Sequence, residues 1–156
     1  MNRMSTAETS PLSTLPADDL SAAASQLRIA TFRLARRMRT QKAVDSMSDG
    51  QFAVLAGLSI HGPHTLGELA DRERVSAPSM NRTVNCLQES GYVRRSADET
   101  DGRKVVISLT DEGRSVVDET ARRRDAWVEE ALAELTPRER RTLAAAAVVM
   151  QRMVAR

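Results

Sequence analysis

The 156-residue sequence lacks the features that define several classes of protein. Its one cysteine, Cys86, excludes an internal disulfide. No apolar stretch approaches the roughly 20 residues that span a membrane, and the N-terminus lacks the continuous apolar segment of a secretory signal. The sequence contains no phosphate-binding glycine loop, no zinc-protease motif and no nucleophile beside a histidine. These absences predict a soluble cytoplasmic protein that is not an enzyme and holds no cofactor or metal.

Lysine is also scarce, because 21 of the 23 basic residues are arginine. Arginine reads phosphates and guanine better than lysine does, although a codon bias toward arginine explains the ratio equally well. A hydrophobic fraction of 41% with a net charge of +2 excludes a wholly disordered chain. The same net charge is too small to indicate nucleic-acid binding by itself, so the local arrangement of the basic residues has to decide.

The chain divides into a tail and one domain. Residues 1–17 contain six Ser or Thr, two Pro and few large apolar residues, which predicts a disordered tail. From Asp18 onward, apolar residues recur at alternating spacings of four and three, which predicts a helix over about 18–42. This stripe consists of Leu20, Ala24, Leu27, Thr31, Leu34 and Met38. We expect residues 18–156 to form a single domain.

Three helices are expected in the middle of the chain. The first covers about 49–61 and ends at a Gly-Pro pair. The second covers about 65–72, because Thr65 and Glu68 have the spacing of a capping box. The third covers about 76–90, with a serine as N-cap, a proline in its first turn and a glycine after its end. Its inward-facing residues are Met80, Val84 and Leu87.

The hydrophobic period changes to that of strands after Gly91. Strands are expected over 92–95 and 104–109, and a tight-turn Asp-Gly pair lies between them, so the two strands form a hairpin. The second strand has Val105, Ile107 and Leu109 on one face.

Two further helices follow the hairpin. Thr110 caps one over about 111–133, and a capping box from Thr136 to Glu139 opens another that runs to about 154.

A short helix, a tight turn, a second helix and a hairpin together predict a winged helix-turn-helix unit over about 49–110. The fold class is therefore mainly α with a small β-hairpin, in which the winged unit is flanked by helices over 18–42 and 111–155. The second helix of such a unit fits the major groove of DNA, and its N-terminus points backbone N–H groups at bases and phosphates.

Four polar residues lie on or beside the outward face of that helix, namely Ser79, Asn81, Arg82 and Asn85. Asparagine can pair with adenine and arginine with guanine, each for about 1–3 kcal/mol of discrimination. An ordinary polar helix surface is the alternative, but the turn, the hairpin and the neighbouring basic residues favour DNA binding. Those neighbours are Arg72, Arg74, Arg94, Arg95, Arg103 and Lys104.

These motifs resemble the multiple-antibiotic-resistance regulator (MarR) family over residues 52–113. The residues that carry the resemblance are His61-Gly62-Pro63, Thr65-Leu66-Gly67-Glu68-Leu69-Ala70, Ser76-Ala77-Pro78-Ser79-Met80-Asn81-Arg82, Leu87 to Arg95, Asp101-Gly102-Arg103 and Leu109-Thr110-Asp111-Glu112-Gly113. The resemblance implies that the helix over 76–90 is the recognition helix of a DNA-binding regulator.

The resemblance also implies roles for single residues. Arg103 would enter the minor groove from the tip of the wing, and Asp101 would hold that arginine in place. Asn81 departs from the family's pattern, which usually has threonine there, so the family's base preference does not transfer. We expect DNA contacts from Ser76, Pro78, Ser79, Asn81, Arg82, Asn85, Arg74, Arg103 and Lys104.

The first and last helices carry apolar stripes that one winged unit is too small to cover. They resemble the family's dimerisation helices, and packing against each other within a monomer is the alternative. A two-fold dimer would place two recognition helices about one DNA turn apart, roughly 10 bp, and predicts a near-palindromic operator.

Other residues have plainer interpretations. We expect Cys86 to be a small packing residue on the flank of the buried stripe rather than a redox sensor. His61 and His64 are too few for a structural zinc site and mark a helix-end turn. Phe32 and Trp127 fit core or interface packing better than an effector pocket, which stays unassigned.

The sequence thus predicts a homodimeric, sequence-specific regulator of transcription that binds double-stranded DNA. The resemblance implies a repressor that a small-molecule effector releases by changing the spacing of the two recognition helices. The alternative is a protein-interaction module that uses the winged fold without reading DNA.

Overall fold

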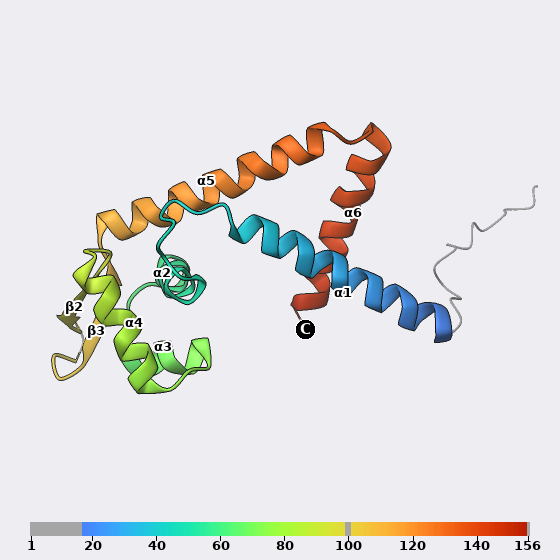
Figure 1. Ribbon diagram of the computed structural model, residues 1–156. Coiled ribbons are helices and arrows are strands. Elements are labelled where there is room, and N and C mark those ends of the chain that lie inside the picture. The colour runs from blue at the N-terminus through green and yellow to red at the C-terminus, as the bar shows by residue number, and fades with distance from the viewer. Residues whose placement is uncertain (1–16, 99–100, 156) are drawn as a thin grey trace, which may run out of the picture. The chain divides into compact units, whose positions relative to one another are not determined.

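The computed structural model describes residues 17–98 and 101–155 of the chain, and Figure 1 shows its ribbon. These residues form six helices and three short strands in the order α1, α2, β1, α3, α4, β2, β3, α5 and α6. The expected class, mainly helical with a small sheet, is confirmed. Of the described helices, none is both long enough and apolar enough to cross a membrane. The described residues divide into two compact units, the first ending at Arg37 and the second beginning at Met38.

Helix α1 (Ala17–Arg39) begins one residue before its expected start and ends three residues before its expected end. The chain leaves the helix early because the following residues bond to other elements; Lys42 Nζ, for example, pairs with the Asp49 carboxylate at 3.2 Å. The expected tail, residues 1–17, lies outside the described residues except for Ala17, which is the first residue of α1.

The three central helices begin and end within two residues of their expected bounds. They are α2 (Asp49–His61), α3 (Leu66–Glu73) and α4 (Ala77–Glu89). The capping box at α3 is present, because the Thr65 hydroxyl accepts from the Glu68 N–H and the Glu68 carboxylate accepts from the Thr65 N–H at 2.7 Å. The bonds from the backbone and hydroxyl of Thr65 lower the pKa of Glu68 below its ordinary value. Helix α4 opens on Ser76, whose hydroxyl accepts from the Ser79 N–H.

The sheet contains the expected hairpin and one additional strand. β2 (Val93–Ala97) and β3 (Val105–Leu109) pair antiparallel, and β1 (His64–Thr65) pairs with the other edge of β3. β1 is not expected from the sequence, because two residues are too few to show the alternation that marks a strand.

β3 is the central strand of this sheet, and its side chains differ in burial along its length. Val105, which shares a face with Ile107 by strand alternation, is nevertheless 55% exposed. Val106 and Ile107 are both buried. The register accounts for this difference: Val105 pairs with Ala97 next to the turn of the hairpin, beyond the reach of β1, whereas Val106 and Ile107 lie between β1 and β2.

One hydrophobic core joins α2, α3, α4 and the sheet. The expected inward stripe of α4 is confirmed, because Met80, Val84 and Leu87 are each at most 2% exposed. Each such side chain removed from water contributes about 1.5–3 kcal/mol to folding. The other buried members of this core are Met47, Val54, Leu55, Leu58, Leu69, Ala70, Val93 and Ile107.

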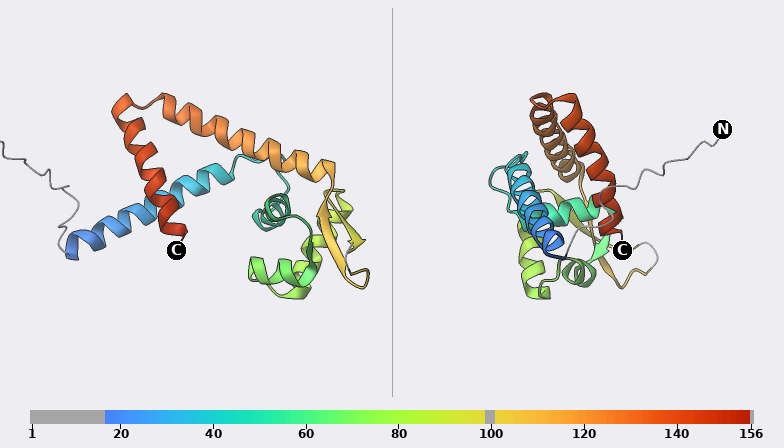
Figure 2. Two further views of the ribbon diagram at one scale, coloured as in Figure 1. Left: turned by 180° about the vertical axis from the view of Figure 1, so that it is seen from behind. Right: turned by 90° about the vertical axis from the view of Figure 1, so that its right-hand side faces the viewer.

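Two helices follow the sheet. α5 (Asp111–Ala133) runs away from the wing, and α6 (Pro137–Val154) turns back from its far end (Figures 1 and 2). Both open on the expected N-caps, Thr110 and Thr136. No described residue of α6 is buried.

The start of α5 lies against the backbone that precedes β2. The Thr110 hydroxyl donates to the Gly91 carbonyl at 2.7 Å, and the Thr110 N–H donates to the Tyr92 carbonyl at 3.1 Å. Gly113 is buried, and a Cβ at this position would overlap the Tyr92 carbonyl oxygen. The close approach of helix and strand therefore requires glycine at position 113.

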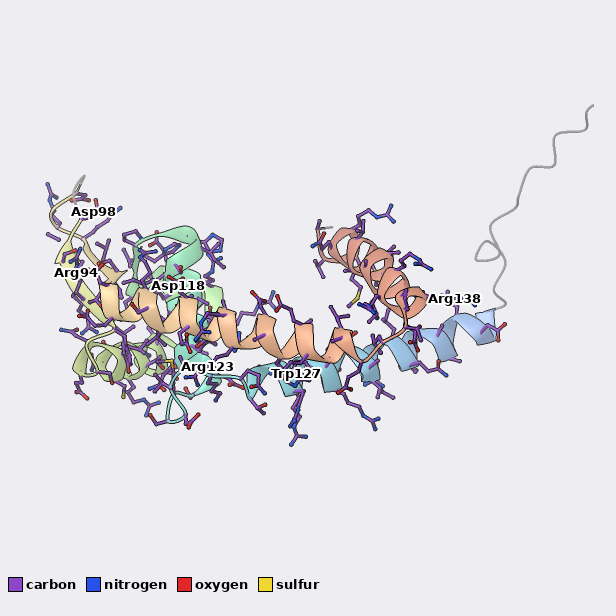
Figure 3. The ribbon with its side chains drawn as sticks, turned by 90° about the horizontal axis from the view of Figure 1, so that it is seen from above. Arg94, Asp98, Asp118, Arg123, Trp127 and Arg138 are labelled. Atoms are coloured by element: carbon purple, nitrogen blue, oxygen red, sulfur yellow. The ribbon has the colours of Figure 1, made fainter. Side chains whose placement is uncertain are left out.

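The segment between α1 and α2 forms a second attachment to α5. The Ala43 N–H donates to the hydroxyl of buried Thr120 at 3.1 Å, and the Arg123 guanidinium donates to the Lys42 carbonyl at 2.6 Å (Arg123 is labelled in Figure 3). The Glu119 carboxylate accepts hydrogen bonds from Arg123 and Arg122. These bonds, chiefly the one from Arg123, lower the pKa of Glu119 below its ordinary value. The first half of α5 is therefore attached at two places, to the backbone before β2 and to the segment before α2.

We expect Gly113→Ala to lower the free energy of unfolding by about 1–3 kcal/mol, because the new methyl group forces α5 away from Tyr92. The matched control is Gly67→Ala, at an exposed position of α3 where a Cβ meets nothing within 4 Å. That control should raise the free energy of unfolding by about 0.5–1 kcal/mol. Urea titration of both variants measures the two changes, and a neutral Gly113→Ala would contradict the close approach.

Candidate nucleic-acid interface

Arg74 makes the sharp turn between α3 and α4. Its backbone is left-handed, with φ 54° and ψ 43°, and within the described part of the chain it is the one non-glycine residue with a positive φ. The Val75 N–H donates to the Ala70 carbonyl at 3.0 Å, which completes the turn. A side chain in this conformation costs about 1–2 kcal/mol. The turn thereby presents an exposed guanidinium shortly before α4 begins.

The N-terminus of α4 lacks the negative charge found at the other capped helices. α2, α3, α5 and α6 each have an acidic residue in the first turn, and α4 has none. A helix N-terminus carries roughly half a positive elementary charge. In the other helices a carboxylate offsets this charge, whereas the first turn of α4 can offer it to an external anion such as a phosphate.

The residues of α4 that are expected to contact DNA differ in their exposure to solvent. Ser76, Pro78, Asn81 and Arg82 are exposed, whereas Ser79 and Asn85 are half-buried. Burial of the opposite stripe fixes this distribution, since it sets the rotation of the helix about its axis. Arg82 faces away from the core, because it lies opposite the buried Met80 and Val84 on the helix.

Arg95 of β2 binds three side chains of α4. Its Nη1 donates to Gln88 Oε1 at 2.6 Å, and its Nη2 donates to Asn81 Oδ1 at 3.0 Å and to Asn85 Oδ1 at 2.9 Å. The three acceptors are spaced by four and three residues, so they lie on one stripe of α4. This cluster connects the wing to the helix expected to enter the groove.

The neighbouring Arg94 lies on the other face of the sheet. Its Nε donates to the hydroxyl of Ser108 at 3.3 Å, directly across the β2–β3 ladder. The alternation of a strand explains the difference, because Val93 is buried against the core and Arg95 shares its face. Two consecutive arginines thus have separate surroundings, and Figure 3 shows Arg94 on the wing.

The tip of the wing is a four-residue turn over 101–104. The Lys104 N–H donates to the Asp101 carbonyl at 2.9 Å, and the Asp98 N–H donates to the Lys104 carbonyl at 2.9 Å. The side chains of Arg103 and Lys104 are both exposed at this turn. Two positive charges therefore lie at the end of the hairpin.

Asp101 contacts Arg103 through the backbone. Its Oδ1 accepts from the Arg103 N–H at 3.2 Å, and its own N–H donates to the Asp98 carboxylate at 2.8 Å. This bond shapes the turn that carries Arg103, and that Asp101 holds the arginine side chain in place stays a prediction.

Several expectations about other residues can be compared with the structure. The expectation that Cys86 is a packing residue is wrong, because Cys86 is exposed on the outward side of α4. Cys86 directly precedes Leu87 of the buried stripe but faces outward, because consecutive residues of a helix are rotated by about 100° about its axis. His64 donates from Nδ1 to the Gly62 carbonyl at 2.9 Å, which fits a helix-end turn. Among residues 17–98 and 101–155, no group of three or more His, Cys, Asp or Glu is placed to bind a metal.

The two aromatic residues considered for an effector pocket differ in exposure. Phe32 of α1 is 62% exposed, whereas Trp127 of α5, labelled in Figure 3, is half-buried. No effector pocket is assigned on these residues.

In the sequence, Arg95 is only one of several basic residues near α4, and its bonds to that helix are not predicted. Strand alternation does place position 95 on the same face as the inward-facing Val93. The distance from this strand to the amides of α4 depends on the tertiary structure and cannot be read from the sequence.

The comparisons with known proteins agree with this geometry. The model of the MarR family matches residues 47–105. The chain is 38% identical over 131 residues to an HTH-type transcriptional regulator of Mycobacterium bovis, covering 84% of this chain and 92% of the relative. It is 29% identical over 118 residues to the HTH-type transcriptional repressor NicR of Pseudomonas putida, covering 76% and 75%. A solved structure of an S. aureus MepR variant bound to an oligodeoxyribonucleotide has the same fold, with a TM-score of 0.66, 17% identity and coverage of 85% of this chain and 97% of that one.

The relatives are regulators rather than enzymes, in agreement with the expectation from the sequence. The matched residues contain α3, the turn at Arg74, α4 and β2, which are the elements of the interface described above. Given this match and the 38% identity over most of both chains, the chain belongs to the MarR family of winged helix-turn-helix, DNA-binding transcriptional regulators.

Proposed function

We propose that this regulator is a repressor that binds a near-palindromic DNA operator as a homodimer and is released by a small-molecule effector. One observation carries the DNA-reading part: the turn at Arg74, the start of α4, the exposed Arg82 and the wing tip with Arg103 all present positive charge within one winged unit. Arginines neutralise phosphates and release counterions, which supplies much of the affinity for DNA.

We assign the proposed DNA contacts of α4 and of the wing to different grooves of the duplex. The start of the recognition helix lies in the major groove, where arginine can pair with guanine. The residues that contact DNA there are Ser76, Pro78, Ser79 and Arg82. Arg103 and Lys104 reach the neighbouring minor groove or its phosphates from the wing. Repression is supported by NicR, a relative named as a repressor, and DNA binding by the MepR variant whose structure contains an oligodeoxyribonucleotide.

Exposed apolar side chains support the homodimer. Apart from Ile60, Val75 and Val105, the exposed large hydrophobic residues of the described chain belong to α1 or α6. In α1 they are Leu20, Leu27, Ile29, Phe32 and Leu34, and in α6 they are Leu143, Val148, Val149, Met150, Met153 and Val154. Two helices that expose so many apolar groups are suited to pairing with a second copy.

The attachments of α5 suggest how an effector could act. Gly113 and Thr120 tie the first half of α5 to the winged unit, while α6 continues the same chain toward the proposed dimer contact. A ligand that favours one orientation of α5 relative to the dimer contact would also change the distance between the two recognition helices. A distance that no longer matches the spacing of the grooves lowers the affinity for the operator.

We expect Arg82→Ala to weaken binding to the duplex upstream of the chain's own gene by about 1–3 kcal/mol, through loss of a base contact. Arg103→Ala should weaken binding to all sequences alike and reduce the salt slope of affinity by about 1. The matched control is Arg138→Ala in α6, which Figure 3 shows at the other end of α5 from the wing. Gel retardation over a series of salt concentrations measures these effects. If both interface variants bind with wild-type affinity and salt slope, the assigned contacts of Arg82 and Arg103 fail. If the wild-type chain itself binds no duplex, the interaction-module alternative stands.

We expect the double variant Leu143→Glu with Met150→Glu to be monomeric, because two buried carboxylates would be placed in the apolar contact of α6. Ile60→Glu is the control, since Ile60 is an equally apolar and 74% exposed residue of α2 outside the proposed contact. Sedimentation equilibrium of the three proteins gives their masses. A wild-type chain that sediments as a monomer at micromolar concentration would contradict the homodimer.

We expect Arg74→Gly to leave the free energy of unfolding unchanged or raise it by up to about 1 kcal/mol, because glycine adopts a positive φ without strain. The same variant should bind DNA more weakly, with a salt slope reduced by about 1, since one phosphate contact is lost. Arg72→Gly, inside the last turn of α3, should instead cost about 1 kcal/mol of stability. Thermal unfolding and salt-dependent retardation separate the two effects, and a destabilised Arg74→Gly would contradict the strain.

A further inference from the structure

The bonds of Arg95 determine which atoms of Asn81 remain available to DNA. A side-chain amide has one oxygen, which accepts, and one nitrogen, which donates. In the structure the Asn81 oxygen accepts from the Arg95 guanidinium at 3.0 Å, and the Asn85 oxygen does the same at 2.9 Å. The donor is cationic, so each of these bonds is about twice as strong as a bond between neutral groups.

Base recognition by asparagine normally uses both ends of the amide. Pairing with adenine requires the oxygen to accept from the N6 amino group while the nitrogen donates to N7. An Asn81 oxygen turned toward Arg95 is poorly placed to accept from adenine as well. The group that remains is the amide nitrogen, which is a donor.

We propose that Arg95 is a positioning residue that fixes Asn81 as a hydrogen-bond donor, and thereby selects against adenine at the base that Asn81 faces. Guanine offers two acceptors in the major groove, N7 and O6, and thymine offers O4, so these bases match a donor. Adenine places its own N6 donor beside its acceptor and opposes the amide nitrogen. This assignment replaces the adenine preference that asparagine alone would suggest.

The structure gives Arg95 the means to hold this orientation. Arg95 is half-buried, and its strand is anchored by Val93, which is 2% exposed in the core. Its guanidinium contacts three amides on one stripe of α4, so no single contact has to set its position. The third contact, to Gln88 at 2.6 Å, lies toward the end of the helix, so that of the two exposed amides, Asn81 and Gln88, it is Asn81 that lies nearer the helix N-terminus.

Because this role rests on the proposed DNA-reading function, the experiment begins with a pool of duplexes of about 30 bp with randomised centres, long enough for two half-sites one helical turn apart. The wild-type chain is used to enrich binding sequences from the pool. Asn81→Ala then identifies the base pair that Asn81 contacts, because the preference there disappears in this variant.

Two substitutions test Arg95 against a matched control. Arg95→Met removes every donor but keeps much of the apolar stem, and Arg95→Lys keeps the charge but lacks the rigid planar fork of donors that holds the three amide oxygens. Arg94→Met removes the same charge from the adjacent residue on the other face of the sheet. Thermal unfolding establishes whether each variant is folded. If Arg95→Met does not fold, Arg95→Lys alone tests the role of Arg95.

At the base pair assigned to Asn81, we expect the wild-type chain to prefer guanine or thymine over adenine by about tenfold, the lower end of the range for a good base contact. Both Arg95 variants should shift the ratio toward adenine by a similar factor. Arg94→Met should lower affinity for all sequences without changing this ratio. In the absence of DNA, Arg95→Met should also move the side-chain amide NMR resonances of Asn81, Asn85 and Gln88, which Arg94→Met should not.

A wild-type preference for adenine at that position would overturn the role of Arg95, as would Arg95 variants whose base profile changes no more than that of Arg94→Met. In both cases DNA reading itself would still stand. If the wild-type chain enriches no sequence at all, the proposed function fails and the role of Arg95 fails with it.

Discussion

Burial of Met80, Val84 and Leu87 is the constraint on which the rest of the interface depends. These side chains join α4 to a core built from α2, α3 and the sheet, and they set the rotation of α4 about its own axis. A turn of the helix by one residue, about 100°, would exchange inward and outward positions and place polar groups in the core. The outward placement of Arg82 and the half-buried placement of Asn85 are therefore consequences of packing rather than of any property of the polar residues themselves.

The wing extends the same constraint to a second element. Val93 belongs to the core, and strand alternation then directs Arg95 toward α4 and Arg94 toward Ser108. A guanidinium among three amides both donates to their oxygens and holds the helix against the sheet. The wing and the helix thus form one surface whose hydrogen-bonding groups are already oriented before any ligand arrives.

The first half of α5 connects this surface to the remainder of unit 38–156. Gly113 allows the helix to start in direct contact with the Tyr92 backbone, and Thr120 bonds to the segment before α2. Both contacts are short and involve backbone atoms, so they leave little freedom between α5 and the winged unit. Beyond them, α6 has no buried residue and exposes its apolar side chains, as the proposed homodimer requires.

The sequence alone determined what depends on neighbours a few residues apart. The N-caps Thr65, Ser76, Thr110 and Thr136, the buried stripe of α4 and the hairpin all follow from local spacing, because capping and helical or strand periodicity act over one or two turns. Tertiary structure decided what depends on contacts between distant segments: the pairing of β1 with β3, the burial of Val106, the exposure of Cys86, the early end of α1 and the three bonds of Arg95. Local patterns say which face a side chain occupies, but only the packed chain places another segment against that face.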